Sequence, residues 1–342
     1  MANPTIAIVG MGVIGRSMGL ALKKAGGNFE IVGHDRELGL ANQAKKLNAI
    51  DRTSWNLINA TEGADLIIMA IPVSAMYDTL KAMAPYLKEG CLILDTCGVK
   101  AAVLEWADEL LPEHVSFVGG DPIVRVPAED AHKTGLDMAS AGLLQNAIFC
   151  LCPSKRAKPE AVQLAANLVS ALGAQPYFLD AFEHDGLVAG VEHLPAVLSA
   201  ALLLTASRAP AWREMRKVAG ESFARASQLP ADTAPALRGA SLSNAQNLTR
   251  WIDEIISRLQ ELKAAIAAGD EKQLDEMYEA ALTSRDKWLH DRAQGFAGED
   301  MPPRTEVPSY WKSLFGLESP LFKRRLPGRG DKEDKDKDTK AR

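Results

Sequence analysis

A glycine turn close to the beginning of the chain constrains its fold more than any other segment. Gly10, Gly12 and Gly15 follow an apolar run at residues 6–9 and lead into a stretch with helical spacing. A strand, a tight glycine turn and a helix in this order are typical of a dinucleotide-binding unit. The first glycine permits the turn, the second lets the backbone approach a pyrophosphate, and the third lets helix and strand pack closely. A plain strand-to-helix turn without a ligand is the alternative.

Further residues for this nucleotide follow from their positions. Val13 and Ile14 begin the predicted helix, whose free N–H groups and partial positive charge favour phosphates. Asp35 closes the second predicted strand, where a carboxylate can accept both ribose hydroxyls and repels a 2′-phosphate. We therefore expect NAD as the cofactor. The neighbouring Arg36 could stack on adenine or pair with a 2′-phosphate, so NADP remains possible.

Short apolar runs alternate with amphipathic segments over the first half of the chain. We expect strands at residues 5–9, 29–33, 66–70, 91–95, 115–118, 147–151 and 176–179, and helices at 13–25, 37–47, 73–87, 99–111 and 159–172. This alternation predicts an α/β, Rossmann-type fold with a mostly parallel sheet covered on both faces. Ile71 and Pro72 follow one strand at the carboxyl edge, where such sheets bind ligands, and we expect them beside the cofactor.

The character of the sequence changes after residue 181, where only helical patterns remain, at 187–207, 211–225, 236–268 and 271–294. We expect a nucleotide-binding domain over 1–180, an all-helical substrate and dimerisation domain over 181–315, and a disordered charged tail over 316–342. The helix at 187–207 is rich in Ala and Leu, which predicts complete burial across a homodimer contact. A monomeric bundle is the alternative.

The composition of the chain limits the classes of binding partner and the compartment that we expect. The net charge of −5 gives no field that favours nucleic acid or an anionic membrane, and no apolar stretch approaches the ~20 residues that span a bilayer. The chain starts almost directly with a strand, so we expect no signal peptide. Three of its four cysteines lie in or next to apolar strand-like runs, which suggests reduced thiols in a cytoplasmic protein. We expect no metal site, because Cys150 and Cys152 would point to opposite faces of a strand.

With these parts in this order, residues 5–292 resemble the prephenate/arogenate dehydrogenase family of tyrosine biosynthesis. The more specific markers are Asp95-Thr-Cys-Gly-Val-Lys100, Gly119-Gly-Asp-Pro-Ile123, His184-Asp185, Glu192-His-Leu-Pro195 and Leu242-Ser-Asn244. The resemblance implies an NAD(P)-dependent oxidative decarboxylation of a small cyclohexadienol acid, such as prephenate or arogenate. Hydride leaves the carbon that bears the 4-hydroxyl for the nicotinamide, and the ring carboxylate departs as carbon dioxide.

The chain departs from this family at the residues that would perform the chemistry. Asp121 stands where the family has its catalytic histidine, and Gly98 stands where it has the serine that orients that histidine. Glu192 and Ala196 replace the serine and the second histidine of a Ser-His-Leu-Pro-His segment, which keeps only His193. Two acids at these places suit a substrate that carries an amine, such as arogenate. A homologue that binds NAD(P) and acts on another substrate, or as a non-enzymatic sensor, is the alternative.

The resemblance also implies catalytic roles for Asp121, His193, Lys100 and Arg225. Lys100 could pair with a substrate carboxylate or begin a helix. His193 could face the substrate cleft or be a satisfied core histidine. Arg225 matches the family's substrate-binding arginine if residues 228–233 are an insertion.

Two further positions have open interpretations. Arg125 could supply a replacement cation, although a solvated loop residue is the favoured interpretation. His184 and Asp185 could form an ion pair at the domain junction, although the cap of a helix N-terminus is favoured.

Overall fold

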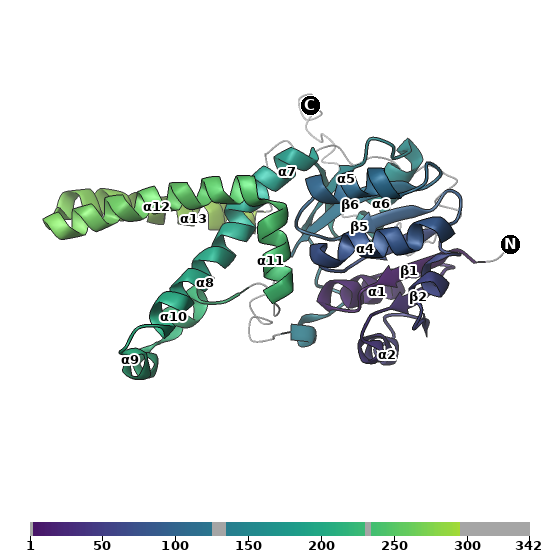
Figure 1. The fold of residues 1–342 in the computed structure, drawn as a ribbon, viewed down its shortest axis with the longest axis horizontal. Coiled ribbons are helices and arrows are strands. Elements are labelled where there is room, and N and C mark those ends of the chain that lie inside the picture. The colour runs from purple at the N-terminus through teal and green to yellow at the C-terminus, as the bar shows by residue number, and fades with distance from the viewer. Residues whose placement is uncertain (1–2, 125–134, 230–233, 295–342) are drawn as a thin grey trace, which may run out of the picture.

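One eight-stranded sheet organises the first half of the chain in the computed structural model, which describes residues 3–124, 135–229 and 234–294 (Figure 1). Its strands are β1 (Thr5–Val9), β2 (Glu30–His34), β3 (Arg52–Thr53), β4 (Leu66–Met69), β5 (Leu92–Asp95), β6 (Ser116–Ile123), β7 (Ile148–Pro153) and β8 (Gln175–Phe178). Their order is β3-β2-β1-β4-β5-β6-β7-β8, and every pairing is parallel except β6 with β7. The mostly parallel sheet expected from the sequence is confirmed.

Helices cover both faces of this sheet. The first face packs against α1 (Val13–Ala25), α2 (Leu38–Lys46) and α6 (Pro159–Ala171), and the second against α3 (Leu57–Thr61), α4 (Val73–Met83), the short 3-10 helix Ala84–Tyr86 and α5 (Ala101–Leu110). Each face has its own hydrophobic cluster, because the central strands are apolar on both sides. Both clusters leave the carboxyl ends of the parallel strands at one edge, where ligands bind in such folds.

The strand that carries Asp121 is longer than the sequence predicts. β6 continues to Ile123, beyond the predicted end at residue 118, and pairs antiparallel with β7 so that Asp121 lies opposite Cys150. The extension contains two glycines and a proline, which have low strand propensity, so the local pattern concealed it. The two-residue strand β3 was missed, because it has no apolar alternation.

Helices alone follow β8 in the described residues. They are α7 (Ala181–Val188), a π-helix (Ala189–His193), α8 (Leu194–Ser207), α9 (Trp212–Val218), α10 (Glu221–Ala226), α11 (Ala234–Ser243), α12 (Ala245–Ala268) and α13 (Glu271–Ala293). Figure 1 shows α12 and α13 side by side as a long pair that reaches away from the sheet, while α8 to α10 form a second projection. The predicted helices at 211–225 and 236–268 are each two helices, the latter broken at Asn244.

The apolar helix after the sheet corrects the prediction that no apolar stretch approaches the length that spans a bilayer. Residues Ala181–Ser207 form a continuous helical run of 27 residues that is apolar and long enough, by length and composition alone, to cross a membrane. Only 22% of its most apolar stretch of 18 residues is buried, and the side chains of Leu202 and Leu204 are 36% and 49% exposed. Within one chain this helix is therefore mostly exposed, and its burial across a homodimer contact stays a prediction. The beginning of the run carries His184, Asp185 and His193, which pack into the sheet domain as described below.

Other predictions concern single residues or the chain end. All four cysteines are free and buried, as expected for core thiols. The charged tail predicted at 316–342 lies outside the described residues.

Candidate active site

The glycine turn between β1 and α1 is shaped by close backbone approaches. Gly10 has a φ of +99°, and a Cβ there would lie 2.2 Å from the carbonyl oxygen of Ala70. A Cβ on Gly15 would lie 2.0 Å from the carbonyl oxygen of Gly10. Side chains are therefore excluded at both positions. Gly12 differs, because no atom lies within 4 Å of a Cβ built on it, so the space beside this backbone is open to a phosphate group.

Asp35 is fixed at the rim of this turn. Its Oδ2 accepts a hydrogen bond from the Met11 amide at 2.7 Å, and its Oδ1 accepts one from the Glu37 amide at 2.8 Å. An ionised carboxylate has about four acceptor positions, so each oxygen can still accept a ribose hydroxyl. The neighbouring Arg36 is exposed, and Val13 and Ile14 are half-buried. The cradle therefore fits a dinucleotide.

Sequence reasoning missed Arg16, which supports this turn from within. The guanidinium is buried; Nε donates to the Met11 carbonyl at 2.8 Å, and Nη2 donates to the Leu40 carbonyl at 3.2 Å. Burial lowers the pKa of Arg16, and the charge of Asp35 opposes that shift. An arginine in the first turn of the helix after the glycines was the only available signal.

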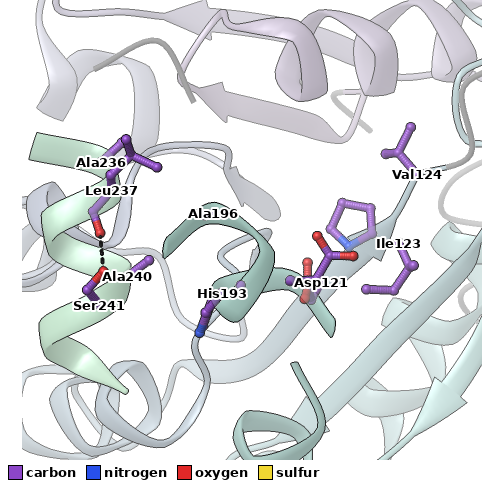
Figure 2. A pocket seen from close by; sticks show the side chains of 12 residues that line it. Asp121, Ile123, Val124, His193, Ala196, Ala236, Leu237, Ala240 and Ser241 are labelled. Atoms are coloured by element: carbon purple, nitrogen blue, oxygen red, sulfur yellow. Dashed lines mark hydrogen bonds between the residues drawn. The ribbon is translucent and has the colours of Figure 1, made fainter. Parts of the chain in front are cut away.

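A cavity of about 320 Å³ lies where the sheet domain meets the helices (Figure 2). Its walls come from four separate segments, and the residues are Gly98, Asp121, Pro122, Ile123, Val124, Glu192, His193, Ala196, Ala236, Leu237, Ala240 and Ser241. The structure thus brings together five positions that the sequence analysis compared with the family's catalytic histidine, its orienting serine and its Ser-His-Leu-Pro-His segment: Gly98, Asp121, Glu192, His193 and Ala196. Ser241 donates to the Leu237 carbonyl at 2.9 Å, within α11.

Asp121 belongs to a row of buried polar groups behind the cavity. Its Oδ2 lies 3.2 Å from His184 Nε2, and His184 Nδ1 lies 2.9 Å from Asp185 Oδ1. Asp185 in turn accepts hydrogen bonds from the Lys100 and Ala101 amides at 2.7 and 2.9 Å, which are the first amides of α5. The predicted ion pair at the domain junction is therefore present. The favoured cap interpretation needs correction: Asp180 caps α7, and Asp185 caps the neighbouring helix α5.

Charges around His184 set its protonation state. Burial by itself lowers the pKa of His184, but hydrogen bonds with Asp121, Asp185 and Cys150 and the charge of Asp121 raise it to about 11. His184 is therefore an imidazolium at neutral pH. The buried row consists of one cation between two carboxylates.

His193 is held in the opposite state. The side-chain amide of Asn244 donates to the Asp185 carbonyl at 2.7 Å, and the same nitrogen lies 3.3 Å from His193 Nδ1. Nδ1 is thus the acceptor, and Nε2 carries the proton. Burial lowers the pKa of His193, against the charges of Asp121 and Asp185. A hydrogen bond with the Gly98 backbone also opposes this shift, so the ring of His193 meets both Asn244 and Gly98 at the wall of the cavity.

Acids dominate the charge of the cavity. Asp121 and Glu192 line it, and no lysine or arginine does so among the described residues. Burial and the charge of Asp121 raise the pKa of Glu192, while the charge of Arg292 acts in the opposite direction. The wall helix α11 also carries Arg238, which follows the lining residue Leu237 and is exposed. The lining is thus suited to a cationic group.

Helix α11 joins this cavity to the predicted cofactor edge. A Cβ on Gly239 would lie 3.0 Å from Val73 Cγ1 and 3.3 Å from the Ser74 amide, at the start of α4. Pro72 is the N-cap of that helix, and Ile71 precedes it. The residues expected beside the cofactor therefore neighbour the helix that forms one wall of the cavity.

Comparison with known proteins identifies the family. The model of the prephenate dehydrogenase nucleotide-binding domain matches residues 18–178, and that of the prephenate dehydrogenase dimerization domain matches residues 180–280. A prephenate dehydrogenase of Lactococcus lactis is 31% identical over 277 residues, which are 80% of this chain and 74% of that protein. This chain belongs to the prephenate dehydrogenase family.

Two further relatives extend the likeness over almost their whole length. A cyclohexadienyl dehydrogenase of Zymomonas mobilis is 30% identical over 286 residues, covering 82% of this chain and 94% of that protein. A solved prephenate dehydrogenase of Aquifex aeolicus, in complex with hydroxyphenyl propionate and NAD+, has the same fold. Its TM-score is 0.74 at 21% identity, over 84% of this chain and 99% of that one. This prephenate dehydrogenase family member is an oxidoreductase with a nucleotide-binding domain.

Within this family member, Lys100 has a place that the sequence did not indicate. The side chain is fully buried, and its ammonium group donates to Asp95 Oδ2 and, at 2.7 Å, to the Gly120 carbonyl. Asp95 Oδ1 accepts from the Gly120 amide at 2.9 Å. Burial lowers the pKa of Lys100, but Asp95 and the other nearby anionic groups raise it overall. The ammonium group therefore links β5 to β6 through these two hydrogen bonds. Lys100 does not line the cavity.

Arg225, which the resemblance names as a substrate-binding residue, lies away from this cavity. The Arg225 side chain is 79% exposed, and its Nε donates to Glu221 Oε1 at 2.8 Å on α10. It does not line the cavity of its own chain. Arg125 lies outside the described residues.

Proposed function

We propose that this protein oxidises a cyclohexadienol acid in the cavity at the domain junction, with Asp121 as the group that accepts the hydroxyl proton. The observation that carries this proposal is the convergence of Asp121, His193 and Glu192 on one cavity beside the start of α4. A carboxylate and an N–H donor in one small site can take a proton from an alcohol and orient the same oxygen.

The cofactor is proposed to lie along the carboxyl edge of the sheet. Gly10, Gly12, Val13, Ile14 and Gly15 would hold the pyrophosphate. Asp35 would take the ribose hydroxyls, with Arg36 on the adenine, and Ile71 and Pro72 would border the nicotinamide end. The fixed carboxylate of Asp35 favours NAD over NADP. When bound, NAD(P) supplies the hydride acceptor.

The residues of the cavity have separate tasks in the proposed reaction. Asp121 accepts the proton of the 4-hydroxyl as that carbon loses hydride. His193 Nε2 donates a hydrogen bond to the 4-hydroxyl oxygen and so keeps the substrate ring in place. The bond from the ring to its carboxylate breaks, its electron pair completes the aromatic ring, and carbon dioxide leaves. The apolar side chains of Ala236, Leu237 and Ala240 exclude water from one wall.

An amine-bearing substrate fits this cavity better than a substrate with two carboxylates only. Asp121 and Glu192 are both acids, and a carboxylate pairs favourably with an ammonium group. We therefore propose arogenate, or an amino acid like it, as the preferred substrate.

We also propose a homodimer formed by the helices beyond the sheet. The described part of that region exposes large apolar side chains, among them Leu204, Ile256, Leu259, Ile266, Leu282 and Trp288. Exposed apolar surface of this extent is typical of an interface. Four buried free thiols support a cytoplasmic location.

The test is an assay of the purified protein with arogenate and with prephenate, each with NAD+ and NADP+. We expect reduction of NAD+ with arogenate as the faster substrate. Asp121→Asn should lower kcat by about 10²–10⁴-fold and leave cofactor affinity unchanged. Asp121→His separates two cases. A loss of activity would mark the carboxylate as the working group, and a gain of activity would mark a degenerate dehydrogenase site. No turnover with either acid would refute the proposal, and faster oxidation of prephenate would refute the substrate preference.

A further inference from the structure

We infer that His184 is a positioning residue for the reaction: as an imidazolium between Asp121 and Asp185, it fixes Asp121 with Oδ2 engaged and Oδ1 left for the substrate. This inference deepens the proposed function and rests on it. The arrangement comes from three elements, because Asp121 lies on β6, His184 on α7, and the amides that hold Asp185 at the start of α5.

The geometry fixes His184 at both of its ring nitrogens. Nε2 lies 3.2 Å from Asp121 Oδ2 and Nδ1 lies 2.9 Å from Asp185 Oδ1. The side chain of His184 is completely buried, and those of Asp121 and Asp185 are 11% and 4% exposed. A ring that donates from both nitrogens must be doubly protonated. One positive charge is therefore enclosed between two carboxylates.

Asp185 is itself held in place, so the imidazolium cannot turn freely. The amides of Lys100 and Ala101 donate to its two oxygens at 2.7 and 2.9 Å. The positive end of α5 supports the charge of this carboxylate. Rotation of Asp121 away from His184 would leave an enclosed cation with one partner fewer, which is costly in a dry environment.

The charged and titratable groups around His184 in the described residues favour its positive charge or leave it undisturbed. Asp121 and Asp185 provide the opposite charges, and Cys150 on β7 is a further hydrogen-bond partner. His193 lies close enough for the two imidazoles to interact, but it is held neutral through Asn244. Lys100 interacts with Asp121 as well, from the side of Asp95. The cation opposite Asp121 is thus fixed by contacts outside the cavity.

The state of His184 can be measured without turnover. In protein labelled with ¹⁵N-histidine, His184→Gln identifies its ring signals, and exposed His290 serves as the reference. We expect both ring nitrogens of His184 to stay protonated at pH 8 to 9. In Asp121→Asn the deprotonation midpoint should fall by about one to three pH units. A neutral His184 ring at pH 8, or a midpoint that Asp121→Asn leaves unchanged, would overturn the inference.

Kinetics provide the second readout. His184→Gln keeps one N–H donor and removes the charge, so we expect a lower kcat, a similar KM and an acid limb of the kcat profile displaced to higher pH. The matched control is His114→Gln, because the His114 ring lies 3.3 Å from the Leu87 carbonyl, away from the cavity, and its loss should leave the profile unchanged. A His184→Gln enzyme with the wild-type profile would overturn the role. If His184→Gln does not fold, the ring signals of the wild type and of Asp121→Asn decide the question.

The two proposals fail in different ways. Wild-type protein without turnover, but with a doubly protonated His184, would refute the proposed function alone. Turnover with a neutral His184 would refute the positioning role alone.

Discussion

The glycine turn and the cavity are held together by different forces. At the turn, a Cβ on Gly10 or Gly15 would come within 2.2 and 2.0 Å of backbone carbonyl oxygens, so steric contact within a short stretch fixes the conformation. At the cavity, Asp121 is held by a buried row of charges that begins at α5 and passes through α7. Packing of backbone against backbone tolerates no added atom, whereas a charged row tolerates no lost partner.

The two regions also differ in the space around their glycines. Gly98 leaves ordinary contact distances, because a Cβ there would lie 3.6 Å from His193 Nε2 and 3.9 Å from Asp121 Oδ2. The position thus accepts a Cβ at ordinary contact distances. Space alone therefore does not require a glycine at this position, unlike at Gly10 and Gly15.

The largest expected effect is the loss of a buried charge near the cavity. Lys100→Met leaves Asp95 enclosed without its cation and should lower the free energy of unfolding by about 3–5 kcal/mol, as measured by urea denaturation. The matched control is Lys23→Met, which removes a partly exposed pair with Asp51 and should cost at most about 1 kcal/mol. Equal losses in both variants would show that burial of the Lys100 pair is energetically unimportant.

His184 should make stability depend on pH. Its pKa is about 11 in the folded protein and lies near 6.5 in an unfolded chain, so it binds its proton more tightly when folded. The contribution is complete below about pH 6.5 and is lost as the pH rises toward 11, on the order of a few kcal/mol. Unfolding of wild type and His184→Gln, compared between pH 6.5 and 11, checks this. The two curves should converge at high pH; parallel curves would contradict the assignment.

The turn should respond to single methyl groups according to position. Gly15→Ala forces a Cβ against the Gly10 carbonyl and should destabilise the fold by about 1–3 kcal/mol. Gly12→Ala meets no protein atom within 4 Å, so it should leave unfolding unchanged and weaken NAD+ binding. Thermal unfolding and calorimetric titration distinguish the two effects. Tight NAD+ binding by Gly12→Ala would place the pyrophosphate elsewhere.

The smallest effect on stability concerns Arg225. Its exposed pair with Glu221 contributes little, so Arg225→Ala should change the free energy of unfolding by at most about 0.5 kcal/mol. The predicted role in substrate binding then requires a second chain, and KM should rise only if α10 reaches the partner's cavity. Arg238→Ala, on the wall helix, is the comparison variant. An unchanged KM in Arg225→Ala would remove the role inferred from the family resemblance.

Parts of this molecule followed from local sequence patterns. The first helix begins at Val13 and ends at Ala25 as predicted, because apolar spacing and the glycine turn mark both of its sides. The strand around Asp121 did not follow, because Gly119, Gly120 and Pro122 have low strand propensity and only the pairing with β7 keeps them extended. The break at Asn244 was missed for a similar reason: the amide serves Asp185 and His193, which are far away in sequence.

The sequence by itself determined the doubly covered sheet, the glycine turn and the positions at which the catalytic set of the family is altered. Periodic apolar residues and obligatory glycines act over a few neighbouring residues, so they can be recognised along the chain. Only the tertiary structure decided that Lys100 is enclosed with Asp95, that Asp185 caps α5, and that His184 lies between two carboxylates. Charge states depend on burial and on partners that come from distant segments, and these exist only once the chain has folded.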